Sequence, residues 1–212
     1  MFSAHRRLNV FVAVIITVVV GGVAGGVVLG ASQTGAPHRH RPISPSLRRH
    51  FSVLRSARAA ASNQGDELPA GVAQEVTGTG SMSAEYKLEP AQARHVILPN
   101  GSGAWVIPGA AGACLFVQSS PSQESGGACG SVASANAGTI MLVKGNQSTG
   151  AKVVFGLAPD GSESVTLTDS EGSTTQVPVS DNVYETTLSP RSQSITVRDA
   201  QGKPTTTRLP GQ

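Results

Sequence analysis

The sequence is poor in aromatic residues and in charge. Its 212 residues include one Trp, two Tyr and five Phe, and only 14% are Asp, Glu, Lys or Arg. Proteins that bind nucleic acid usually place stacking aromatics or a groove-entering helix on a basic surface. Residues 81–212 carry eight Lys and Arg against ten acidic residues, whereas residues 1–80 carry eight Arg against three. The excess positive charge thus lies in residues 1–80, outside the domain that we predict for residues 81–212, and we expect no nucleic-acid partner.

Recognisable motifs of catalysis are also missing. The chain has no G-x-S-x-G, Walker loop, H-E-x-x-H or kinase signature, and no G-x-G-x-x-G follows a predicted strand. His95 is the only histidine after residue 80, so every triad or zinc site in that region would need it. We therefore predict no catalytic, metal or cofactor-binding residue and no cofactor. The alternative is a hydrolase without a recognisable motif, whose paired carboxylates converge only in the fold.

One long apolar run is present near the N-terminus. Residues 8–30 contain no charge, and as a helix they would measure about 34 Å, enough to cross a bilayer core. We predict a single transmembrane helix after a cytoplasmic tail of residues 1–7. The alternative is a cleaved secretory signal with Arg6 and Arg7 as its basic region, although such apolar regions are usually shorter.

The orientation of this helix is less clearly marked. Four arginines follow it and two precede it, which on a simple count favours a cytoplasmic C-terminal part. Arg6 and Arg7 adjoin the helix, however, and the later composition suits the exterior. We predict a single-pass protein of the cell membrane with its C-terminal domain outside the cytoplasm, or a secreted protein if the signal is cleaved.

Three glycines of this apolar run are spaced four residues apart. Gly22, Gly26 and Gly30 would lie on one face of a helix. Small residues at this spacing allow two membrane helices to approach closely. A homodimer through the transmembrane helix is therefore a possible assembly, although glycine is common in membrane spans.

Residues 31–80 form a predicted linker that contains a basic amphipathic helix. Proline and glycine suit residues 31–45 to an extended spacer. Ser46 can cap a helix over about residues 46–61, in which Leu47, Phe51 and Leu54 recur at helical spacing. One interpretation places it on the lipid bilayer, with headgroup contacts from Arg39, Arg41, Arg48, Arg49 and Arg55. The other packs its apolar stripe on the domain that follows.

For residues 81–212 the sequence pattern predicts a mainly β domain, which we place outside the cytoplasm. Short apolar or alternating runs are separated by turn residues, a pattern typical of an antiparallel meander or sandwich. We expect strands at residues 96–98, 105–108, 115–118, 140–143, 153–156, 164–168, 174–179, 195–198 and 205–209. Two turns, at residues 169–172 and 199–202, share Asp at the first position and Gly at the fourth. This spacing predicts that both segments form the same type of hairpin turn, and it favours this interpretation over calcium binding.

Cys114 and Cys129 are the only cysteines. An even number of cysteines in an extracytoplasmic domain favours a disulfide, here closing a Ser/Gly-rich loop at a gain of about 3 kcal/mol. Redox chemistry would normally use C-x-x-C, and free thiols are the remaining alternative. We predict a structural disulfide.

Several segments resemble uncharacterised bacterial membrane-anchored or secreted β-domain proteins of unknown function. They are GAWVIPG, ACLFV, GGACGS, GLAPDGSESVTLTD and VPVSDNVYE, within residues 46–210. The resemblance implies an architecture but no activity, substrate or site residue. Together the patterns predict a non-enzymatic binding or structural module of the cell envelope, with an unknown protein or cell-envelope component as ligand.

Overall fold

The computed structural model describes residues 42–55, 66–77, 82–118, 125–145 and 150–210. Contacts divide the chain into units Met1–His38 and Arg39–Gln212, and every described residue belongs to the second. Within the described ranges, no helix is long and apolar enough to cross a bilayer. The predictions that lie outside the described residues are those for the N-terminal tail, the apolar span, Gly22, Gly26, Gly30, Arg39 and Arg41.

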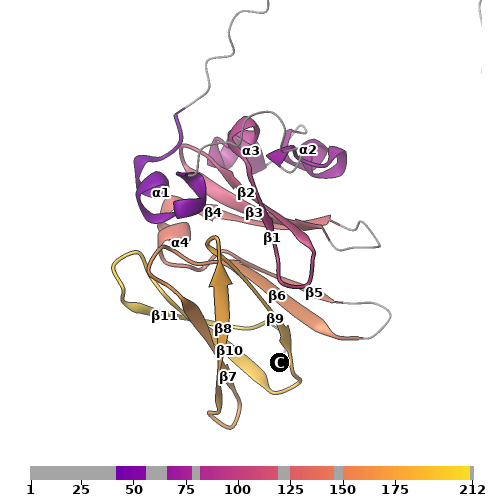
Figure 1. Cartoon of the computed structure of the whole chain (residues 1–212), viewed down its shortest axis with the longest axis vertical. Coiled ribbons are helices and arrows are strands. Elements are labelled where there is room, and N and C mark those ends of the chain that lie inside the picture. Colours follow the sequence, from indigo (N-terminus) through magenta and orange to yellow (C-terminus); the bar gives the residue numbers. More distant parts are fainter. Residues whose placement is uncertain (1–41, 56–65, 78–81, 119–124, 146–149, 211–212) are drawn as a thin grey trace, which may run out of the picture. The chain divides into compact units, whose positions relative to one another are not determined.

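The fold is mainly β, as the sequence predicts, and its two antiparallel sheets form a sandwich-like arrangement (Figure 1). The helical elements are α1 (Pro45–His50), η1 (Ser52–Leu54), α2 (Ala70–Thr77), α3 (Met82–Tyr86), η3 (Pro90–Gln92) and α4 (Val132–Asn136). The strands are β1 (Arg94–Ile97), β2 (Gly103–Pro108), β3 (Gly112–Gln118), β4 (Ser125–Ser131), β5 (Met141–Gly145), β6 (Lys152–Leu157), β7 (Ser164–Asp169), β8 (Thr174–Ser180), β9 (Val183–Leu188), β10 (Ser192–Arg198) and β11 (Pro204–Arg208).

The first sheet is a meander in the order β1-β2-β3-β4, and it is covered on both faces. Residues alternate along β2, so that Val106 contributes to a core cluster shared with α1 and β6 while Ile107 packs with α2. Along β3, Leu115 and Phe116 divide in the same way. Burial on both sides explains why β2 and β3 are continuously apolar in the sequence. Cys114 and Cys129 face each other across β3 and β4 and form the predicted disulfide.

The second sheet has the order β11-β10-β7-β8-β9-β6-β5 and is not the simple meander that we expected. β9 returns to pair with β6, and β10 pairs with β7. β8 and β9 share only two residue pairs, at Val179 and Ser180, so the sheet divides there. A second apolar cluster, including Val165, Tyr184 and Ile195, fills the space between the two halves.

The predicted basic helix is much shorter than residues 46–61. α1 ends at His50 and Phe51 is extended, with φ −132°. In a continuous helix the amides of Ser52 and Val53 would donate to the carbonyls of Arg48 and Arg49. Instead they donate to the side chains of Asp160 and Asn182, at 2.7 and 2.9 Å.

Arg55 takes over the two carbonyls that the helix leaves unpaired. Its Nη1 donates to the backbone oxygens of Arg48 and Arg49, at 3.1 and 2.7 Å, and to Asp160 Oδ2 at 2.7 Å. The helix therefore stops at this point because side chains from the β domain satisfy its backbone better than another turn would. Nor does Ser46 cap the helix, since α1 begins at Pro45 and Ser46 Oγ accepts from Asn136.

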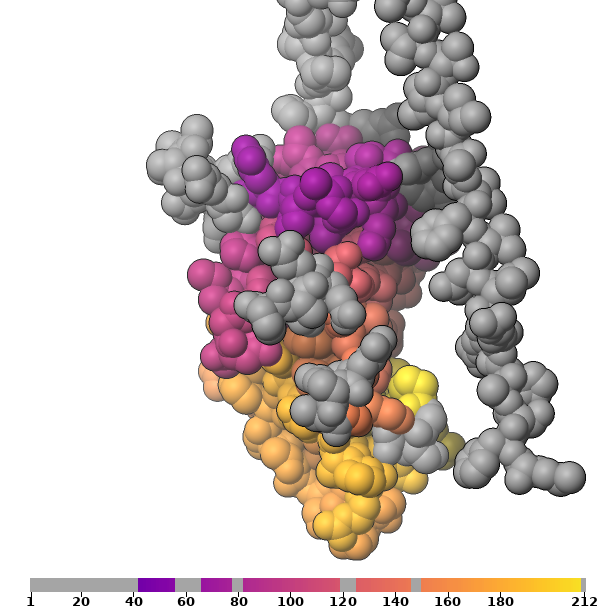
Figure 2. Space-filling model, turned by 90° about the vertical axis from the view of Figure 1, so that its right-hand side faces the viewer, coloured from indigo at the N-terminus to yellow at the C-terminus, as the bar shows by residue number. Residues whose placement is uncertain are grey.

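The segment from Ile43 to Leu54 is part of the folded unit rather than a linker. Leu47, Phe51 and Leu54 are buried in the core cluster shared with β2 and β6. In Figure 2 the earliest described residues, in indigo and purple, are packed on later parts of the chain. The apolar stripe thus packs on the β domain, the second of the two interpretations given above. The structure also moves the domain boundary, which we had placed near residue 81, to the N-terminal side of Ile43.

We refer to Asn182, Asp160, Arg55 and the backbone of residues 52–53 as the clamp. Asn182 is 5% exposed, and its Oδ1 also accepts from Ser52 Oγ at 3.0 Å. Its Nδ2 donates to Ala158 O and Asp160 Oδ1, both at 3.0 Å. One asparagine therefore joins the N-terminal segment to two loops of the second sheet.

The clamp predicts an acid-dependent loss of stability. Burial alone would raise the pKa of Asp160, but hydrogen bonds from Asn182, Arg55 and Ser52 outweigh it and hold this pKa below its usual value. A carboxylate with a lowered folded pKa stabilises the protein fully above its unfolded pKa, and this contribution is lost as the pH falls through the folded pKa. In urea unfolding, the deficit of Asp160→Asn should be constant from pH 5 to 7 and shrink below about pH 4. A deficit independent of pH would contradict this role.

The two Asp-containing turns have the same geometry, as their sequences predict. Asp169 Oδ1 accepts from the amides of Glu171 and Ser173, at 2.9 and 2.8 Å. Asp199 Oδ1 accepts from the equivalent amides of Gln201 and Lys203, at the same two distances. Gly172 and Gly202 close the turns with φ of 82° and 79°, where a side chain would be strained.

Tyr184 fills the second cluster but leaves its hydroxyl without a hydrogen-bond partner among the described residues. Its ring lies over Gly156 of β6, where an added Cβ would come within 2.3 Å of Tyr184 Cζ. Burial without a partner costs free energy and raises the pKa of the phenol. Tyr184→Phe should therefore raise the free energy of unfolding by about 1 kcal/mol. A thermal shift assay can check this, and a loss of stability would contradict it.

Candidate functional site

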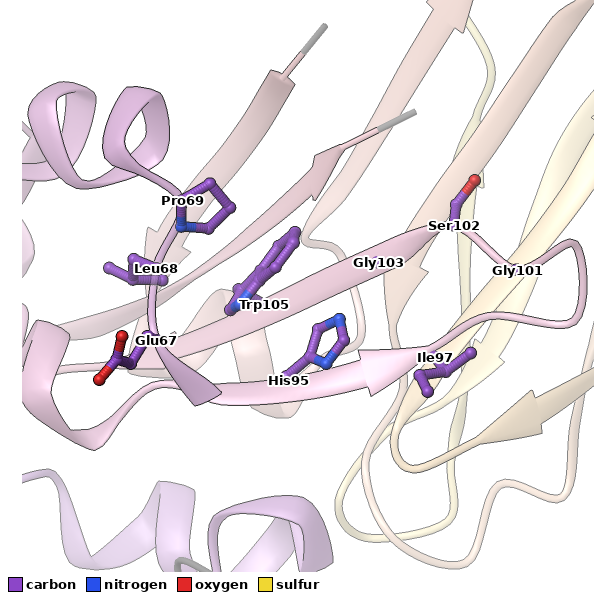
Figure 3. A pocket seen from close by; sticks show the side chains of 9 residues that line it. All are labelled: Glu67, Leu68, Pro69, His95, Ile97, Gly101, Ser102, Gly103 and Trp105. Carbon is purple, nitrogen blue, oxygen red and sulfur yellow. The ribbon is translucent and has the colours of Figure 1, made fainter. Parts of the chain in front are cut away.

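An open groove of about 540 Å³ lies on the outer face of the first sheet, where α2 does not cover the β1–β2 hairpin. Figure 3 shows its lining: Glu67, Leu68 and Pro69 on the approach to α2, and residues of the hairpin. His95 and Ile97 point to this face from β1, since they are two residues apart in a strand. The groove therefore combines a loop wall with a strand floor.

The floor is a stacked pair of rings over a glycine. His95 and Trp105 are direct partners in the β1–β2 register, and their ring centroids are 4.7 Å apart at 26°. An added Cβ at Gly103 would lie 2.8 Å from both His95 Nε2 and Trp105 Cη2. Glycine at this position thus allows the two rings to lean across β2. Trp105 itself is only 6% exposed and packs in the cluster under α2, so its role is mainly structural.

Ile97 is the most unusual residue of the groove because it is 70% exposed. A single exposed apolar residue is ordinary, but this one lines the same open depression as two further apolar residues, Leu68 and Pro69, which lie across the His95–Trp105 pair from it in Figure 3. From the sequence we predicted a strand at residues 96–98 but did not foresee this site. Three consecutive apolar residues in an edge strand were the available signal, since alternation sends one of them to the opposite face.

β1 is an edge strand, and part of its outer edge is unpaired. His95 N–H points away from β2 and donates to Asp66 Oδ1 at 2.9 Å. By alternation the backbone N–H and C=O of Ile97 point the same way, whereas Leu98 N–H points inward and donates to Ser102 O. Asp66 thus occupies the outer edge of β1 at His95, and the next outward-pointing backbone groups, those of Ile97, are available for hydrogen bonding.

The charge at the groove is negative at one end. Burial lowers the pKa of His95, and the nearby Asp66 carboxylate only partly offsets this, so the ring is neutral at pH 7. Glu67 is exposed, and within the described ranges neither Asp66 nor Glu67 forms a salt bridge. Two carboxylates therefore flank the groove, and neither has a salt-bridge partner in the described part of the chain.

The polar residues of the groove do not form a hydrogen-bonded nucleophile–base pair. Ser102, His95 and Glu67 all line it, but no hydrogen bond joins Ser102 to His95 or His95 to Glu67. A nucleophile and its base normally lie within hydrogen-bond reach. Among the described residues no group of three or more His, Cys, Asp or Glu side chains could hold a metal ion.

The structure places the described lipid-contact candidates in different surroundings. Arg48 and Arg49 are exposed on α1, and Arg48 donates to Gln92 at 3.2 Å. Arg55 forms the salt bridge with Asp160 that belongs to the clamp. Arg55 therefore has a structural role that the sequence does not reveal, although its side chain is 47% exposed, and Arg48 and Arg49 are exposed as well.

The fold and the groove together define a disulfide-linked, sandwich-like β domain with an apolar depression beside a free strand edge. Comparison with known proteins adds no relative: no family model, curated protein or solved structure matches the chain.

Proposed function

We propose that this chain is a single-pass, membrane-anchored protein whose β domain lies outside the cytoplasm and binds a protein of the cell envelope through the β1–β2 groove. The observation that carries the proposal is Ile97, a large apolar side chain that is 70% exposed beside an open groove. Covering this side chain by a partner would remove apolar surface from water and so favour binding at the groove.

Two features support the location. The Cys114–Cys129 disulfide is of the kind that persists in oxidising compartments rather than in the cytosol. The uncharged run of residues 8–30 is long enough to serve as an anchor. In this arrangement Arg39, Arg41, Arg48, Arg49 and the half-exposed Arg55 are available to anionic headgroups, and each could contribute about 1 kcal/mol.

Site-specific photo-crosslinking in intact cells tests the binding role. A photoreactive amino acid at Ile97 of the full-length chain should capture an envelope protein. The same amino acid at Thr175, an exposed strand residue of the second sheet, serves as the matched control. Capture at both positions, or at neither, would contradict the proposal.

Dimerisation through the span is a separate part of the proposal. Gly26→Ile would separate two closely packed helices, so association measured in a membrane should fall several-fold. Unchanged association would remove Gly22, Gly26 and Gly30 from the proposed interface.

A further inference from the structure

We propose that the free edge of β1 accepts an extended segment of the partner as a fifth strand of the first sheet, and that this segment carries an apolar residue for the groove and a basic residue for the Asp66–Glu67 end. This inference rests on the proposed binding function and specifies the chemistry of the partner.

The backbone of β1 supports strand addition. Ile97 N–H and C=O and His95 C=O point to the outer edge, and no hydrogen bond to the described residues occupies them. Asp66 already accepts from His95 N–H, as an added strand would. The added strand would therefore pair with β1 at Ile97 and end at His95, where Asp66 already occupies the edge. A peptide with its own backbone can satisfy these groups, whereas a compact ligand cannot match their spacing.

The side chains favour a peptide over a sugar. Carbohydrate sites present an open aromatic face, but Trp105 is only 6% exposed beneath His95 and the groove wall. The apolar lining of the groove is Ile97 at one end and Leu68 and Pro69 at the other, and an aliphatic side chain of the partner can contact either. In an added strand, side chains alternate, so a residue that fills the groove has neighbours that face away from it.

The negative charge of Asp66 and Glu67 indicates which residue the partner's segment carries at one end. Asp66 and Glu67 lie at the end of the groove beside His95, whose ring is neutral at pH 7. A Lys or Arg of the partner would complement them. Pairing of β1 with a second copy of this chain would leave Asp66 and Glu67 without a cation from β1 of that copy, whose outward-facing residues at this edge are His95 and Ile97.

Three synthetic peptides provide the first test, using the full-length chain in detergent micelles. The parent has six residues, with lysine at both ends and alternating threonine and valine between them. Two isomers carry N-methyl groups on alternate residues, so that each blocks hydrogen bonding along one edge only. We expect one isomer to bind about tenfold more weakly than the parent and the other to bind within about twofold. Equal binding of all three, or equal loss in both isomers, would overturn strand addition.

Substitutions in the protein itself test the same contacts. Ile97→Pro removes an edge donor without touching the β2 ladder and should weaken parent binding at least tenfold, whereas Ile97→Val should change it less than twofold. Glu67→Lys should reverse the preference between the lysine peptide and its glutamate counterpart. An unchanged preference would overturn the assigned charge. If Ile97→Pro does not fold, the N-methyl isomers and Glu67→Lys still decide the proposal.

The outcomes separate this inference from the proposed function. Crosslinking at Ile97 together with indifference to N-methylation would leave a binding module but contradict strand addition. Absence of crosslinking at Ile97 would contradict the binding module itself. Sedimentation of the full chain supplies the remaining outcome, because a dimer that Ile97→Pro converts to a monomer would assign the edge to a second copy and overturn the peptide proposal.

Discussion

Replacing Cys114 and Cys129 together by alanine is expected to lower the free energy of unfolding by about 3 kcal/mol. The two residues are 15 positions apart and face each other across β3 and β4, so the disulfide limits the unfolded chain. β4, whose sequence is SGGACGS, brings little apolar surface of its own, and loss of the disulfide should loosen it first.

Urea unfolding of the full chain in detergent, with and without reductant, measures this effect. Reductant should destabilise the native chain by the same amount and leave the double alanine variant unchanged. A native chain that is insensitive to reductant while its disulfide is demonstrably reduced would contradict the role assigned to the bond.

Asn182→Ala should cost about 3 kcal/mol, because it removes the centre of the clamp. The amide of Val53 and the carbonyl of Ala158 lose their partners in a site where Asn182 is 5% exposed. Asn182 also has φ 65°, a conformation that asparagine tolerates better than alanine. We expect residues 43–55 to open before the sheets, so amide hydrogen exchange should rise there selectively.

Two control variants separate the side chain from the backbone. Asp181 has φ 47° and is exposed, so Asp181→Ala reports the backbone strain alone, about 1 kcal/mol. Asn182→Gly relieves the strain but removes the hydrogen bonds, and it should remain more than 1 kcal/mol less stable than the native chain. If Asn182→Gly were as stable as the native chain, the clamp would contribute nothing.

Local turn chemistry was the most predictable part of the fold. Asp169 and Asp199 determine their turns through bonds to amides two and four residues later, and glycine follows at the position that needs positive φ. All of this lies within five residues, so the sequence alone carries the information. The strands next to these turns were predicted for the same reason.

β4 was not predicted because its packing comes from a distant residue. Gly127 of β4 has no side chain, and the ring of Phe116 in β3 occupies the place where its Cβ would lie, 2.5 Å from Phe116 Cε1. A facing aromatic ring supplies the packing that a strand of small residues lacks, and only the pairing of strands reveals it. β9, with the sequence VYETTL, was also missed, although its own composition favours a strand.

The N-terminal segment shows why helical periodicity predicted too long a helix. Leu47, Phe51 and Leu54 do face one core, as the spacing indicates. The helix nevertheless ends at His50, because Asp160 and Asn182, more than 100 residues later, bind the amides that would continue it. Competition between local and distant hydrogen bonds cannot be seen in a window of sequence.

The candidate groove was hidden for a related reason. Its members come from residues 67–69 and from β1 and β2, and the exposure of Ile97 depends on where α2 stops covering the sheet. The disulfide and the mainly β fold were predicted from the sequence. Which apolar residue remains exposed depends on how the elements pack and was not predicted.

Hydrogen–deuterium exchange at the amide of Ile97 tests the central claim most directly. In the free full-length chain this amide should exchange rapidly, while that of Val96, directed toward β2, exchanges slowly. Addition of the lysine peptide should slow exchange at Ile97 at least tenfold and leave the exposed strand residue Thr175 unchanged. An Ile97 amide that is already protected in the free chain, or one whose exchange does not respond while the peptide is bound, would contradict the account.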